Sequence, residues 1–239
     1  MTSGAAMVET EPRRRVTTQP RRALAATWIG LVIALILPPI LSYLLPTRLE
    51  SVTRTLVREC IFWTCAAAVV LIVVRWEKRP LSSIGLTKPT WTSLLLGVAG
   101  FGVLGIAYGL VSLLQQAVGM PETEQGISTL LVLPVWLRLL LVLRAGVVEE
   151  ILYRGYPIER IGWLSGSRSL GAIVPLIVFS LMHVPFWGIA HLPVVVVAAA
   201  VLTVLYIWKR DLTVNMIAHF LTDLVGVIVV PLVRTPQLP

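Results

Sequence analysis

The sequence predicts an all-α, polytopic membrane protein with about seven transmembrane helices, within a range of six to eight. Of its 239 residues, 56% are hydrophobic and only 13% are charged, whereas soluble domains carry about 25% charged residues. Apolar runs close to bilayer-spanning length recur along the chain, and the mean hydropathy is +0.86. These runs lack the alternation of polar and apolar residues that is typical of barrel strands, so we expect helices.

The net charge of +8 arises from 17 arginines and 3 lysines against 12 acids. In a soluble protein this excess would suggest a nucleic-acid partner. Here the basic residues cluster at the ends of apolar runs, as the positive-inside rule describes for membrane proteins. We therefore expect membrane lipid as a partner and no nucleic acid.

The N-terminal region, residues 1–22, is predicted to be a disordered, basic cytoplasmic tail. It contains "PRRRVTTQPRR", and the apolar run that follows is of full span length, unlike the short hydrophobic segment of a cleavable signal peptide. The excess of Arg over Lys and the richness in Ala and Val indicate a high-GC bacterium. The predicted location is therefore a multi-pass position in a bacterial cell membrane, with a cytoplasmic N-terminus.

Residues 23–75 are predicted to form two N-terminal transmembrane helices. The first covers about 24–45, and Pro38 and Pro39 are expected to kink it. The second covers about 60–75. A basic loop rich in turn residues follows and is expected in the cytoplasm.

Residues 76–233 are predicted to form the functional core, and 234–239 a short C-terminal tail. Pro134, Arg138 and Arg144 interrupt one apolar run, so part of 128–137 is expected at the membrane interface. The spans of the core are predicted at about 92–114, 138–161, 170–187, 192–208 and 213–233.

Five ionisable residues are predicted to lie well inside the apolar helices of the core. A charged side chain at the bilayer centre costs roughly 2.5–3.5 kcal/mol even on insertion scales. Such residues therefore mark functional sites by default, facing a bundle interior or a wet cavity. They are Glu149, Glu150, His183, His219 and Asp223.

Helical spacing assigns these residues to different faces. Glu150 and Arg154 are four residues apart and can form an ion pair, and His219 and Asp223 share one face in the same way. Adjacent helical residues diverge by ~100°, so Glu149 points away from Glu150. The spacing predicts that Glu149 is free to meet the two imidazoles and Asp223.

This set of side chains suits hydrolysis. A carboxylate in a low-dielectric pocket can act as general base on a water molecule, and imidazoles can orient that water or stabilise an oxyanion. The alternative is a catalytic zinc ion held by Glu149, His183 and His219. The histidines lie on different helices, unlike those of H-E-x-x-H zinc peptidases, which favours metal-free catalysis.

Packing alone is the competing interpretation of each residue. Glu150 and Arg154 could serve only to hold helices together, and Asp223 could simply orient His219. A single intramembrane histidine is often a packing residue. For His191, in a predicted loop, packing is the preferred interpretation.

Three motifs resemble those of the CPBP intramembrane protease family, which includes the CAAX prenyl endopeptidases and the bacterial Abi and bacteriocin-immunity proteins. "EEILYR", "FSLMH" and "HFLTD" correspond in order to E-E-x-x-x-R, F-x-x-x-H and H-x-x-x-N/D. The resemblance covers about residues 75–233. It implies that Glu149 activates water with the help of His183. It also implies that His219 and Asp223 form the oxyanion or second-site pair, and that Glu150 and Arg154 are a supporting ion pair.

Two departures from the family pattern are visible, since Tyr153 stands where Phe is common and Asp223 where Asn is common. The Asp adds a negative charge beside His219, which favours metal binding slightly. The resemblance does not specify a substrate, and a bacterial origin makes a prenylated one less expected.

The sequence thus predicts an intramembrane endopeptidase that hydrolyses a membrane-associated protein or peptide. Two alternatives belong to other classes. A small proton-coupled transporter would also place Glu, His and Arg in the membrane, but no inverted repeat is visible. A non-catalytic immunity or scaffold protein of the same fold has no need of this ionisable set.

Overall fold

The structure of the protein is a computed structural model that describes residues 21–46, 50–120 and 125–234. Within these ranges the chain is helical and contains no strand. Nearly all of the predicted N-terminal tail, 1–22, and of the predicted C-terminal tail, 234–239, lies outside the described residues.

Helices of the length and composition needed to cross a membrane confirm the predicted class. Among the described residues there are six such helices. An integral, all-α membrane protein follows from them. The six helices are Ala23–Tyr43, Ser51–Trp76, Trp91–Ala117, Arg168–Trp187, Ile189–Lys209 and Leu212–Val233.

A further continuous helix runs from Val135 to Ser165, and we call it the motif helix. The sequence predicts it at about 138–161, slightly shorter than observed. It consists of α6 (Val135–Arg144), two π-helical turns, and α7 (Tyr156–Ser165); the turns are η3 (Ala145–Glu149) and η4 (Ile151–Gly155). It is not among the six helices identified by length and composition, because it carries more charged residues than they do.

The N-terminal helices are α1 (Arg21–Leu35), α2 (Leu37–Tyr43) and α3 (Ser51–Leu71), the last continued by η1 (Ile72–Trp76). Pro38 stands in the first turn of α2, where a missing backbone N–H is tolerated. The break between α1 and α2 therefore falls where the sequence predicts a kink.

The predicted start of the second span, near residue 60, is wrong. The helix begins at Ser51. The charged residues that suggest a loop in the sequence lie within this helix, and Glu59 is only 2% exposed. Charged residues near the start of a membrane helix are tolerated when they face protein rather than lipid.

The remaining helices complete the bundle. A Thr90–Ser93 capping box starts α4. In order they are η2 (Leu81–Ile84), α4 (Trp91–Ala117), α5 (Gln125–Leu131), α8 (Arg168–Trp187), η5 (Ile189–His191), α9 (Leu192–Lys209), α10 (Leu212–Asp223), η6 (Leu224–Val229) and α11 (Val230–Arg234).

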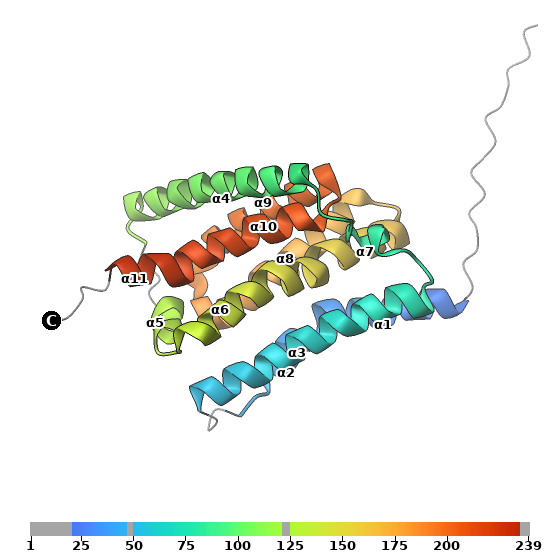
Figure 1. Cartoon of the computed structure of the whole chain (residues 1–239), viewed down its shortest axis with the longest axis horizontal. Coiled ribbons are helices and arrows are strands. Elements are labelled where there is room, and N and C mark those ends of the chain that lie inside the picture. The colour runs from blue at the N-terminus through green and yellow to red at the C-terminus, as the bar shows by residue number, and fades with distance from the viewer. Residues whose placement is uncertain (1–20, 47–49, 121–124, 235–239) are drawn as a thin grey trace, which may run out of the picture.

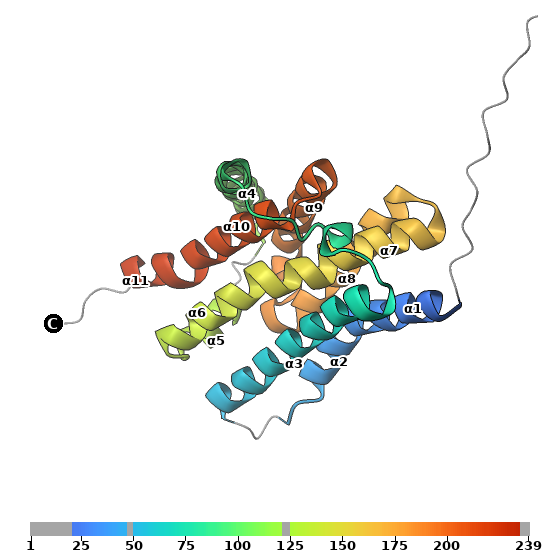
Figure 2. The same cartoon turned by 45° about the vertical axis from the view of Figure 1, so that its right-hand side comes forward.

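The motif helix occupies the middle of the bundle. In both views it lies between α10 on one side and α3 on the other (Figures 1 and 2). Gly146 makes the close approach of α10 possible, since a Cβ there would lie 2.7 Å from the Cβ of Phe220 and 3.0 Å from its Cα. The polar residues of the motif helix are thus surrounded by protein.

Candidate active site

Glu150 is the most enclosed carboxylate of the motif helix, with no exposed surface. Its Oε1 accepts hydrogen bonds from Arg154 Nη1 at 2.9 Å and from His219 Nδ1 at 2.7 Å, and its Oε2 accepts one from Asn215 Nδ2 at 3.1 Å. The predicted Glu150–Arg154 ion pair is therefore present. Three donors satisfy this buried charge, and two of them come from α10.

Glu149 points to a different side of the motif helix, as the ~100° step between neighbours requires. Its Oε1 accepts a hydrogen bond from Arg144 Nη1, and Arg144 Nε also donates to Glu59 Oε1 at 2.9 Å. The prediction that Glu149 is free of an ion-pair partner is therefore wrong. Glu149 nevertheless lies within electrostatic range of both His183 and His219.

The π-helical turn explains the Arg144–Glu149 contact. In an α-helix, residues five apart point about 140° away from each other. In a π-helix the backbone hydrogen bonds join residues five apart, so these residues fall on one face. The α-helical spacing used for the sequence prediction could not bring Arg144 beside Glu149.

His183 lies on α8, one turn after Phe179. Its Nδ1 is 2.6 Å from the carbonyl oxygen of Phe179, and a carbonyl can only accept. The proton must therefore be on Nδ1, which leaves Nε2 of the neutral ring as an acceptor. Phe179 fixes the position of this ring, with the two ring centroids 4.4 Å apart.

His219 lies on α10 and faces two carboxylates. Nδ1 donates to Glu150, and Nε2 is 3.6 Å from Oδ2 of Asp223, four residues along the helix. The same Phe179 ring lies 6.4 Å from the His219 ring, and the Arg154 guanidinium lies 4.0 Å from its centroid. The three motifs thus meet around Phe179.

Sequence reasoning missed three residues that contact this cluster: Glu59, Arg144 and Asn215. Asn215 precedes His219 by four residues and so shares its helical face, a signal that the sequence does contain. Glu59 had no such signal, because it was assigned to a loop. Glu59 and Glu77 are two further buried acids, which the predicted set of intramembrane acids, Glu149, Glu150 and Asp223, does not include.

The donor groups in this arrangement do not fit a zinc ion. Over residues 21–46, 50–120 and 125–234, no three His, Cys, Asp or Glu side chains are grouped closely enough to hold a metal. Glu149 is engaged by the Arg144 guanidinium. A metal site at Glu149, His183 and His219 would need this contact to be exchanged.

His191 lies in η5, outside the three motifs. Its ring stacks on Trp187, with the centroids 4.9 Å apart and the planes at 23°. This contact agrees with the packing interpretation of His191.

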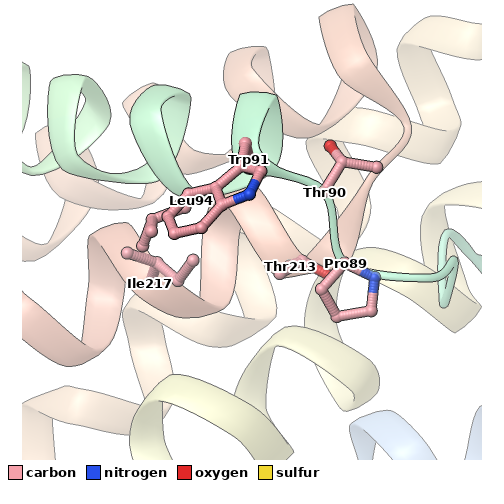
Figure 3. Close-up of a pocket in the computed structure, with 6 residues that line it drawn as sticks. All are labelled: Pro89, Thr90, Trp91, Leu94, Thr213 and Ile217. Carbon is pink, nitrogen blue, oxygen red and sulfur yellow. The ribbon is translucent and has the colours of Figure 1, made fainter.

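A hollow of about 370 Å³ lies at the start of α4, away from the polar cluster. Figure 3 shows its lining side chains on α4, on the segment before it, and on α10. None of them belongs to the three motifs, so we assign the hollow no part in the site. The lining residues are Pro89, Thr90, Trp91, Leu94, Thr213 and Ile217.

Comparison with known families shows that the part of the chain carrying the three motifs is similar to a class of proteases. Residues 131–225 match the family described as Rce1-like, type II CAAX prenyl endopeptidase. All three motifs lie inside this range, which confirms the predicted resemblance to the CPBP family. The match supports a membrane-embedded protease, a hydrolase. No curated protein and no solved structure matches the chain.

Proposed function

We propose that this protein is an intramembrane endopeptidase in which Glu149 activates the attacking water. The observation that carries the proposal is the position of Glu149. It is 5% exposed, lies within electrostatic range of His183 and His219, and belongs to a segment that matches a protease family. The substrate is a membrane-associated protein or peptide, and the site is in a multi-pass protein of a bacterial membrane with a cytoplasmic N-terminus.

The reaction divides the roles among the three motifs. Water bonded to Nε2 of His183 gives a proton to Glu149 while its oxygen attacks the scissile carbonyl carbon. The carbonyl oxygen becomes an oxyanion. In its doubly protonated form His219 has an Nε2–H that can donate to that oxyanion, and Asp223 orients the ring. Glu149 then returns the proton to the leaving amine as the C–N bond breaks.

Glu150 and Arg154 support this geometry and do not enter the chemistry. Glu150 fixes His219 through Nδ1, and Arg154 balances the buried charge. The arrangement resembles the way in which a carboxylate orients an imidazole in hydrolytic triads.

We also propose that no metal takes part. The support is the engagement of Glu149 by the Arg144 guanidinium, together with the lack of a three-ligand group among the described residues. Elemental analysis of purified protein, with cleavage assays in a strong chelator, tests this. Near-stoichiometric zinc whose removal stops cleavage and whose return restores it would move Glu149, His183 and His219 to a ligand role.

The main experiment uses the full chain in liposomes with a library of lipid-anchored peptides, and products are identified by mass spectrometry. Glu149→Gln should lower the cleavage rate by about 100- to 10,000-fold, the usual contribution of a general base. Glu159→Gln is the matched control, since Glu159 lies on the same helix but pairs with the exposed Arg210. Cleavage by Glu149→Gln at the wild-type rate would overturn the proposal.

A further inference from the structure

Helix α3 and the motif helix are joined by two buried ion pairs. Glu59, eight residues after the start of α3, and Glu77, directly after η1, pair with Arg144 and Arg160. The separations along the two helices, eighteen and sixteen residues, correspond to about 27 and 24 Å at 1.5 Å per residue. In both views the two helices run side by side (Figures 1 and 2).

The ion pair between Glu77 and Arg160 makes contacts that only hold helices together. Glu77 accepts hydrogen bonds from Thr27 at 2.8 Å, Tyr156 at 2.9 Å and Arg160 Nε at 2.8 Å, and Arg160 Nη2 also donates to Ser83 at 3.0 Å. None of these residues belongs to the candidate site. This pair attaches α7 to α1 and to the end of the α3–η1 helix. We assign it no further role.

The pair at Glu59 continues to the proposed general base. Arg144 donates Nε to Glu59 and Nη1 to Glu149, so one planar guanidinium joins both carboxylates. The ring of Phe62 lies 4.6 Å from the same guanidinium. Two residues of α3 therefore fix Arg144, and Arg144 in turn fixes Glu149.

This arrangement leaves one oxygen of Glu149 available for chemistry. Oε1 is held by Arg144, and within the described part of the chain no donor is bonded to Oε2. A carboxylate held at one oxygen keeps a defined direction for the other, which a general base needs. Arg144 sets this direction, and Glu59, which holds Arg144, comes from α3, outside the segment that matches the protease family.

We infer that Glu59 and Arg144 are positioning residues that orient Glu149 for proton transfer, with Glu59 acting through Arg144. The inference rests on the proposed function, because it assigns Glu149 the role of base. It predicts that α3 is needed for catalysis itself as well as for the stability of the bundle.

The test compares Glu59→Gln with Glu77→Gln in full-length protein, using the best-cleaved peptide of the library. The two variants make the same chemical change to a buried carboxylate that pairs with an arginine of the motif helix. Glu59→Gln should lower kcat by about 10- to 100-fold with KM within about twofold, the scale expected for a displaced reacting group. Glu77→Gln should leave kcat and KM, per folded molecule, within about twofold of the wild-type values. Its melting temperature should nevertheless fall.

Two further variants guard against a folding defect. Glu59→Asp retains the carboxylate and should recover part of the kcat lost in Glu59→Gln. Arg144→Lys keeps the charge but loses the planar fork, so it should lower kcat. In the Arg144→Lys background, the further change Glu59→Gln should lower kcat by a smaller factor than it does in the wild-type background. The reason is that Glu59 acts on Glu149 through the Arg144 guanidinium, which is already absent.

The outcomes separate the inference from the proposed function. If Glu149→Gln abolishes cleavage while Glu59→Gln and Glu77→Gln have equal kcat, the positioning role is overturned and the endopeptidase stands. If Glu149→Gln cleaves normally, both fall, because Arg144 would then orient a group that performs no chemistry.

Discussion

α4 and the motif helix are similar in length but opposite in what surrounds them. α4 has no Asp, Glu, Lys or Arg over its 27 residues, and most of its large side chains are exposed on the molecular surface. The motif helix carries seven charged residues, and Glu149, Glu150 and Arg154 among them are at most 5% exposed.

The difference shows what each part of a membrane bundle is built to face. An apolar exposed surface is what lipid solvates, so α4 needs no polar partners. The buried charge of Glu150 is tolerated because a guanidinium of the same helix and imidazole and amide groups of α10 satisfy it. Function is therefore expected where charge is buried, and lipid contact where it is absent.

The largest expected effect comes from breaking the buried pair of the motif helix. Arg154→Ala leaves Glu150 buried without its cation, which should cost about 3–5 kcal/mol of stability. The measurement is thermal unfolding and folded yield in detergent, with the exposed Arg75→Ala as control. Equal yield and melting temperature of Arg154→Ala and wild type would refute a structural ion pair.

A smaller effect is expected from the contact between the motif helix and α10. Gly146→Ala would place a Cβ 2.7 Å from the Cβ of Phe220 and 3.0 Å from its backbone. Relieving this overlap should cost about 1–3 kcal/mol and move His219 relative to Glu150, so cleavage should fall as well. An unchanged melting temperature with unchanged cleavage would mean that α10 is more loosely packed than we describe.

On α4 the same replacement of glycine by alanine should have the opposite effect on stability. Gly105→Ala meets no atom within 4 Å, and alanine favours a helix by about 0.8–1.0 kcal/mol over glycine in aqueous hosts. Stability should therefore stay the same or rise by up to about 1 kcal/mol. A clear loss would indicate that this face of α4 is covered by another chain.

The smallest expected effect tests whether the contribution of an ion pair to stability depends on its burial. Arg210 pairs with Glu159 of the motif helix at 2.5 Å, but its side chain is 62% exposed. Exposed pairs contribute about 0.2–1 kcal/mol, so Arg210→Ala should lower stability by no more than that. A loss as large as that of Arg154→Ala would remove the distinction between buried and exposed charge.

The sequence predicted the helices well where hydropathy decides, as in α4 and α8. It also identified the three motifs, because ionisable residues in apolar runs are rare. It failed for Glu59, whose charged neighbourhood resembles a loop until the burial of α3 is known. It failed for Arg144 because α-helical spacing was applied to a π-helical turn. The first error concerns burial that depends on tertiary structure, and the second concerns a local departure from α-helical geometry.

The most direct test of the account is a single-turnover cleavage in water enriched in ¹⁸O. Attack by a water that Glu149 activates should place one ¹⁸O atom in the new carboxyl group of the product, and Glu149→Gln should form no such product over the same time. A product carboxyl without ¹⁸O, or labelled product formed equally by Glu149→Gln, would contradict the central claim.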